Sequence, residues 1–271
     1  MSSLSLSGKS WFLKKYNQED VTFIKDNYSL DEITSKLLSI RKVKKEEINS
    51  FLNPVIKNFI PNPNTLIDIE KSSLRTYEAI INKEKIGIFG DYDVDGAAAA
   101  ALLILVMREL GVGCDVHIPD RFTEGYGPNT AALLALREKG AQLIVTVDCG
   151  ITAHAPLTAV ADTGIDVIVI DHHIAGPELP RAHSVVNPNR LDEDGQYGYL
   201  CAAGVVFVTL VNIFLVNSGS TDTFTGNFRA NFLRHYLPRF LAAMPPRIIF
   251  FLATPPRIIF FLAAVFIMPP P

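Results

Sequence analysis

The chain has 271 residues, a mean hydropathy of +0.23 and a formal net charge of −3, which is enough length and apolar content for one large domain or two modest ones. Its three cysteines, Cys114, Cys149 and Cys201, are too few and too scattered for a disulfide framework, and the Ser-rich start lacks the features of a secretory signal. These features exclude a small disulfide-stapled secreted domain, and we expect a cytoplasmic protein.

Charge is unevenly distributed along the chain. Residues 1–85 carry 14 basic and 11 acidic side chains, whereas residues 86–228 carry 6 basic and 17 acidic ones. Residues 229–271 contain five arginines and no acid. An acidic centre repels a phosphate backbone unless cations sit in it, so the middle of the chain either binds metal or avoids nucleic acid.

The chain begins with short helices and continues as an alternation of strands and helices. Residues 1–84 are predicted to form a helical N-terminal subdomain, broken at Pro54 and by the turn at 61–64. Alternation over residues 85–217 predicts an α/β core, a parallel sheet flanked by helices. Its expected strands are 86–89, 115–118, 143–147, 167–170 and 184–186, and its expected helices are 97–110, 129–139, 155–161 and a buried one over 202–216.

The C-terminal tail, residues 218–271, has a different character. A nine-residue segment, Pro-Pro-Arg-Ile-Ile-Phe-Phe-Leu-Ala, occurs at 245–253 and again at 255–263, and no solenoid family has this period. A membrane-spanning helix is one interpretation, but the apolar run 258–268 is about half of the ~20 residues that a span needs. We therefore expect no membrane association and predict an aberrant or poorly folded tail.

The first acidic motif follows the strand predicted at 86–89. Asp91, Asp93 and Asp95 occupy alternate positions, which places their carboxylates on one side of the chain. A calcium EF-hand loop would need a Glu where Leu102 stands and a helix before the motif, so that interpretation fails. Simple capping of the following helix by these carboxylates is the structural alternative.

Two further strands also end in polar motifs. Asp148 follows the strand at 143–147, and Asp171-His172-His173 follows the strand at 167–170. Ligands of open α/β sheets bind beyond the carboxyl ends of the strands, so these side chains should converge. The expected cluster of mixed carboxylate and imidazole groups suits Mn²⁺ or Mg²⁺, and a two-metal site is plausible. Its members are Asp93, Asp95, Asp148, His172 and His173.

These motifs resemble those of a known family. The segments 91–96, 148–150 and 171–173 are similar to successive signature motifs of the DHH phosphoesterases, and the segments 119–127, 186–188 and 200–205 resemble the RecJ-type exonucleases within that family. The resemblance covers residues 10 to 216, and it implies a DHH phosphoesterase fold over residues 85–217. It implies that the five clustered side chains are metal ligands, that Asp91 and Asp171 orient them, and that Arg121 contacts a substrate phosphate.

The activity implied by the resemblance is hydrolysis of single-stranded DNA from its 5′ end during recombination and repair. An alternative for Arg121 is a surface salt bridge with Glu124. The later aspartate of the RecJ-type exonucleases, in a Val-Ala-Asp-Val-like stretch, has no counterpart here, since Asp222 stands in a different context. Two alternatives therefore stay open, a small-substrate phosphodiesterase acting on cyclic dinucleotides or oligonucleotides, and a catalytically dead fragment.

Overall fold

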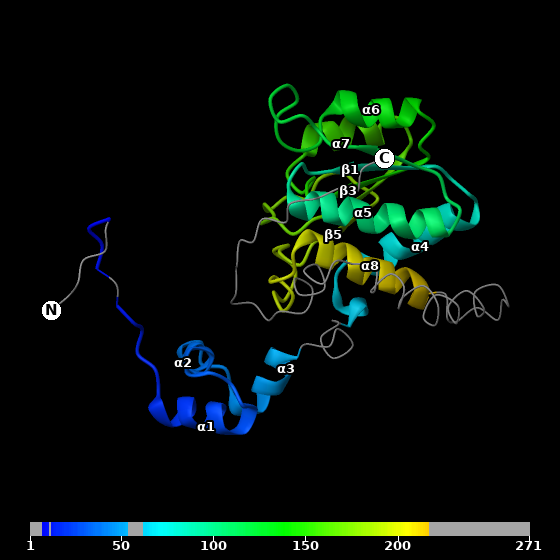
Figure 1. The fold of residues 1–271 in the computed structure, drawn as a ribbon. Coiled ribbons are helices and arrows are strands. Elements are labelled where there is room, and N and C mark those ends of the chain that lie inside the picture. Colours follow the sequence, from blue (N-terminus) through cyan, green and yellow to red (C-terminus); the bar gives the residue numbers. More distant parts are fainter. Residues whose placement is uncertain (1–6, 11, 54–61, 217–271) are drawn as a thin grey trace, which may run out of the picture. The chain divides into compact units, whose positions relative to one another are not determined.

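A computed structural model describes residues 7–10, 12–53 and 62–216 (Figure 1). The chain divides into two compact units, Met1–Asn58 and Phe59–Pro271. Predictions for the tail at 218–271 lie outside the described residues. Among the described residues, no helix combines the length and the apolar character that crossing a membrane requires.

The N-terminal unit is helical, as its sequence predicts. It contains α1 (Gln18–Tyr28), α2 (Glu32–Ile40), the short 3-10 helix η1 (Lys45–Glu47) and α3 (Ile48–Leu52). Side chains of Asn17 and Asp31 accept hydrogen bonds from the first backbone N–H groups of α1 and α2, so both helices begin at capped ends. Ile24, Leu38 and Ile48 form the small core of this unit.

The second unit is built on a five-stranded parallel sheet. Its strands, which have the order β2-β1-β3-β4-β5, are β1 (Ile86–Gly90), β2 (Cys114–His117), β3 (Leu143–Val147), β4 (Asp166–Ile170) and β5 (Ser184–Val186). The predicted α/β fold with a parallel sheet is therefore confirmed. Because chain order reverses between β1 and β3, the sheet has its topological switch point there, where open α/β sheets bind ligands.

Helices cover both faces of the sheet (Figure 1). One face carries α6 (Thr130–Glu138) and α7 (His154–Ala161), and the other carries α4 (Ile69–Ile81), α5 (Val94–Glu109) and α8 (Ala202–Val216). Buried side chains such as Phe89, Leu133 and Ile144 fill the layer under α6 and α7. The sequence predicts residues 1–84, which include α4, as the N-terminal subdomain, whereas α4 packs against α8 and β5. The unit boundary accordingly falls near residue 58 in the structure.

The carboxyl ends of four strands are level with one another. In the pairing register, Gly90 lies opposite Val147, Val147 opposite Ile170, and Ile170 opposite Val186. The ladder continues for one more residue, because the N–H groups of Asp91, Asp148 and Asp171 each donate to the neighbouring strand's last carbonyl. The residue that follows each strand is thus held at one edge of the sheet, which we call the acidic rim.

Candidate metal centre

The loop after β1 turns tightly into α5 and fixes Asp91 and Asp93. The Oδ1 atom of Asp93 accepts hydrogen bonds from the N–H groups of Asp95 at 2.8 Å and Gly96 at 3.0 Å, so this carboxylate does cap the helix. A Cβ atom at Gly96 would lie 2.5 Å from the carbonyl oxygen of Asp91. Only glycine allows the helix to start this close to the strand end.

Asp95 has a second role that its sequence position does not reveal. Its carboxylate accepts hydrogen bonds from the N–H groups of Ala202 at 2.7 Å and Ala203 at 2.9 Å, the first residues of α8. The same carboxylate lies 3.6 Å from Nε2 of His172. Asp95 therefore joins the start of α8 to the acidic rim.

Asp148 lies at the centre of the cluster. Its backbone has a φ of 60°, the left-handed conformation that Asp and Asn tolerate better than most residues. The side chain is 1% exposed, and among the described residues its carboxylate oxygens have no partner beyond an ion-pair contact between Oδ1 and Nε2 of His172 at 3.2 Å. Burial, reinforced by the nearby carboxylates of Asp95 and Asp93, raises the pKa of Asp148 to about 7.

The motif after β4 is held by its aspartate. Oδ1 of Asp171 accepts hydrogen bonds from Nδ1 of His173 at 2.7 Å and from the backbone N–H of His172 at 2.7 Å. Its other oxygen accepts from the N–H of Ile151 at 3.0 Å. Burial opposes ionisation of Asp171, but these donors hold its pKa below the usual value, and the ion pair raises the pKa of His173 to about 9.

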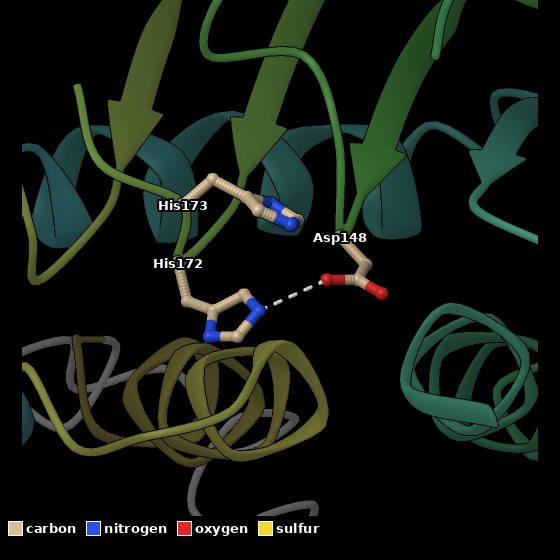
Figure 2. A group of neighbouring side chains, drawn as sticks. All are labelled: Asp148, His172 and His173. Atoms are coloured by element: carbon tan, nitrogen blue, oxygen red, sulfur yellow. Dashed lines mark ion pairs between the residues drawn. The ribbon is translucent and has the colours of Figure 1, made fainter. Parts of the chain in front are cut away.

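His172 and His173 approach Asp148 beyond the strand ends (Figure 2). Nε2 of His172 lies 3.2 Å from Oδ1 of Asp148. Ligand atoms of Asp148, His172 and His173 lie within 4.8 Å of one another, and so do those of Asp91, Asp93 and Asp148. Oδ1 of Asp91 is also buried without a partner among the described residues.

This donor set fits divalent cations. Buried carboxylate oxygens without donors are costly to leave ionised, and a cation would satisfy them while neutralising their repulsion. Oxygen and imidazole ligands with no thiolate suit Mn²⁺ or Mg²⁺, and the thiol of Cys149 instead packs in the core. Asp91 belongs to one of the two groups that could hold a metal, whereas the sequence predicts Asp91 as an orienting residue and Asp95 as a ligand.

Arg121 lies on a loop between β2 and α6 beside the acidic rim. Its guanidinium is 5.1 Å from the centroid of the Tyr92 ring, and among the described residues it forms no salt bridge with Glu124. Glu124 instead accepts hydrogen bonds from the N–H of Asp120 and the amide of Asn129, and contacts the His117 ring at 2.7 Å. These contacts fix the loop that carries Arg121.

Two asparagines support the histidines, a role that the sequence did not predict for either of them. The side-chain amide of Asn187 donates to the carbonyl of His173 at 2.9 Å, and that of Asn189 donates to the carbonyl of His172. Asn187 directly follows β5, so its position one residue beyond a strand end was a usable signal. Together these amides hold the backbone of the histidine pair.

Comparison with known proteins identifies relatives of this site. The DHH family, N-terminal domain, matches residues 85–228. The chain is 33% identical over 198 residues to the single-stranded-DNA-specific exonuclease RecJ of Bacillus subtilis, covering 73% of this chain and 25% of the relative. It is 39% identical over 160 residues to the protein of the same description from Escherichia coli, covering 58% of this chain and 28% of the relative.

Solved structures agree with these relationships. A manganese-bound exonuclease RecJ superposes with a TM-score of 0.50 at 32% identity, covering 57% of this chain and 38% of the other. RecJ of Thermus thermophilus in complex with Mn²⁺ has a TM-score of 0.56 at 24% identity, covering 76% and 28%, and supports the fold alone. The chain spans about a quarter of the length of the curated relatives described above.

Proposed function

Because the chain belongs to the DHH family, whose relatives here are nucleases, we propose that it is a metal-dependent hydrolase that cleaves phosphodiester bonds of single-stranded DNA from the 5′ end, in recombination and repair. The proposed metals are Mn²⁺ or Mg²⁺ in a two-metal site. The proposed ligands are Asp93, Asp95, Asp148, His172 and His173, with Asp91 as a further oxygen donor.

One observation carries the proposal: the carboxylate of Asp148 is buried, has no partner among the described residues beyond the ion-pair contact with His172, and lies within ligand distance of groups from two other strand ends. A structural role for Asp148 would call for hydrogen-bond donors around its oxygens, as Asp171 has. Cations supply what the described protein groups do not. Placement at the switch point of the sheet leaves the cluster open to a substrate.

The residues around the site have different proposed roles. Bound cations would neutralise the carboxylates, polarise the phosphodiester and activate the attacking water. Asp171 accepts a hydrogen bond from Nδ1 of His173, so Nε2, which lies 3.4 Å from the Tyr126 hydroxyl, is the nitrogen that could bind a metal. Asp95 fixes His172 relative to α8, and Arg121 offers a guanidinium to a phosphate oxygen.

The test uses the purified chain, Mn²⁺ and single strands labelled at either end. We expect mononucleotide release from 5′-labelled strands, and a loss of about 10³-fold in rate for Asp148→Asn, equivalent to about 4 kcal/mol of transition-state stabilisation. Asp162→Asn is the matched control, because Asp162 pairs with Arg181 on the surface. No release by the wild-type chain would favour the catalytically dead fragment.

A small-substrate phosphodiesterase is the second candidate, since residues 62–216 carry 20 acidic and 10 basic side chains, an excess of negative charge that disfavours a long polyanion. Faster hydrolysis of dinucleotides than of long single strands by the same preparation would favour it. Both activities would depend on Asp148, so substrate length, not the variant, separates these two functions.

A further inference from the structure

The N-terminal unit contains a surface hollow of about 760 Å³ whose rim is rich in lysine. Lys15, Lys42, Lys44 and Lys45 line it, and all four are exposed. Among the described residues that line the hollow, Asp20 is the single acid. This basic hollow lies between the segment that precedes α1 and the turn that follows α2.

The buried Ser39 side chain connects the two segments that line the hollow. Oγ of Ser39, at the end of α2, accepts a hydrogen bond from the N–H of Asn17 at 3.0 Å and lies 3.3 Å from the Asn17 carbonyl. These contacts hold the segment with Lys15 against the end of α2. Lysines that are 27 or more positions apart in sequence therefore meet on one surface.

Lys42 occupies a position where glycine is usual. The N–H of Lys42 donates to the carbonyl of Ser39, and that of Val43 donates to Leu38, which is the Schellman arrangement at a helix end. Lys42 has the left-handed φ of 56° that this motif requires. A lysine here costs more than a glycine would, so the backbone conformation does not account for the lysine at this position.

The end of α4 offers a comparison. Lys83 occupies the equivalent left-handed position with φ of 55°, and its Nζ donates to the carbonyl of Leu110 at 2.7 Å. The ammonium groups of Lys42 and Lys15 have no such partner among the described residues. Lys44 and Lys45 form exposed pairs with Glu47 at 3.5 Å and Asp20 at 3.9 Å, which stabilise little, and Nζ of Lys45 also lies 4.6 Å from the centroid of the Phe23 ring. The hollow therefore presents positive charge to solvent.

We propose that the basic hollow binds the phosphate backbone of single-stranded nucleic acid. This inference rests on the proposed function for its substrate class. Residues 62–216, the described part of the unit with the metal centre, carry 20 acidic and 10 basic side chains, so this part of the chain repels a long polyanion away from its cations. A separate basic surface in the same chain offsets that repulsion.

Aromatic side chains favour a nucleic acid over an acidic peptide as the ligand. Tyr16 lines the hollow, and Nζ of Lys36 lies 5.2 Å from the centroid of its ring. Phe12, three residues before Lys15, is 82% exposed. Lysines interleaved with aromatic rings are the usual surface for single strands, because phosphates pair with the ammonium groups while bases stack.

Binding of a fluorescently labelled 20-nucleotide single strand to the full chain in EDTA tests the inference without hydrolysis. We expect Lys15→Gln/Lys42→Gln to weaken binding about tenfold and to lower the slope of log affinity against log salt by roughly 0.7 per lysine. The control Lys71→Gln/Lys139→Gln removes two exposed charges from the other unit and should bind as wild type does. Equal affinity of all three proteins for the labelled strand would overturn the inference. Displacement of the labelled strand by polyglutamate as effectively as by an unlabelled single strand would overturn it as well.

Lys42→Gly separates lost binding from lost folding. It removes the charge and relieves the left-handed backbone, so we expect weaker binding with an unchanged or higher melting temperature. Weaker binding only together with a lower melting temperature would contradict the inference. A chain that binds through these lysines but never hydrolyses DNA would refute the proposed function alone, whereas a chain that hydrolyses DNA independently of them would refute this inference alone.

Discussion

The two edges of the sheet differ in how their carboxylates are paired. At the amino ends of the strands, Arg75 donates to Asp166 at 2.6 Å and to Glu84 at 2.7 Å, so the carboxylates there have a cationic partner within the chain. At the acidic rim, Oδ1 of Asp91 is buried without a partner among the described residues, and the buried carboxylate of Asp148 has only the ion-pair contact with His172. The difference indicates that the carboxylates of the amino edge are paired by Arg75, although its Nη1 is buried without a partner among the described residues, whereas the carboxylates of the acidic rim would be paired by the cations of the proposed function.

The largest expected effect is that of Mn²⁺ on the free energy of unfolding, which depends on the acidic rim alone. Mn²⁺ at about one hundred times its dissociation constant should raise the free energy of unfolding by about 2.7 kcal/mol. Asp148→Asn should lose that gain, because the central oxygen ligand is gone, while Asp162→Asn should keep it. Thermal denaturation with Mn²⁺ and with EDTA measures both effects. Equal stabilisation of Asp148→Asn and wild type would remove Asp148 from the metal site.

The pH dependence of the metal-free protein sharpens the same point. Burial raises the pKa of Asp148 to about 7 from a model-compound value of 3.8. A carboxyl group whose pKa is raised on folding destabilises the folded state at pH values above its folded-state pKa, where it is ionised. The destabilisation decreases as the pH falls through the folded-state pKa, and it is gone below the pKa of the unfolded state. In EDTA, Asp148→Asn should therefore be more stable than wild type at pH 8, and the difference should close by about pH 4.

Removing the Arg75 ion pairs at the amino ends of the strands should lower the free energy of unfolding, and Mn²⁺ should not restore it. Arg75→Met leaves Glu84 and Asp166 without their partner, and we expect a loss of about 2 kcal/mol, reduced from the fully buried case because the Asp166 side chain is 43% exposed. Arg181→Met, which removes the exposed partner of Asp162, should change stability by less than about 1 kcal/mol. Urea denaturation with and without Mn²⁺ measures this, and rescue of Arg75→Met by Mn²⁺ would contradict the comparison.

A glycine pair tests the geometry of the two edges without changing charge. Gly96→Ala places a Cβ 2.5 Å from the Asp91 carbonyl oxygen, so α5 must shift and we expect a loss of about 2 kcal/mol together with weaker Mn²⁺ binding. Gly113, before β2 at the other edge, has room, with the nearest atom 3.8 Å from an added Cβ. Gly113→Ala should be close to neutral in the same denaturation and titration measurements. Full Mn²⁺ affinity in Gly96→Ala would show that the helix start is not critical.

Sequence periodicity and strand-end reasoning predicted the sheet and most of the convergence. Alternation of strands and helices set the α/β class, and the rule that ligands bind beyond strand ends brought Asp148 and His172 together. Contacts made only in the tertiary structure were not predictable. Asp95 caps a helix that starts 107 positions later, and nothing local to Asp95 indicates this. The same holds for α4, whose amphipathic pattern does not specify which unit it covers.

The smallest expected effect concerns the loop beside the acidic rim. Glu124 fixes this loop through His117, Asp120 and Asn129, and so positions Arg121 near the site without being a metal ligand. Glu124→Gln keeps the size of the side chain but weakens the charge-assisted contacts, and we expect about a tenfold rise in KM for single-stranded DNA with little change in Mn²⁺ affinity. Glu138→Gln, on the exposed face of α6, should leave both quantities unchanged. A fall in Mn²⁺ affinity in Glu124→Gln would mean that the loop supports the metal centre itself, and an unchanged KM would mean that Arg121 needs no such support.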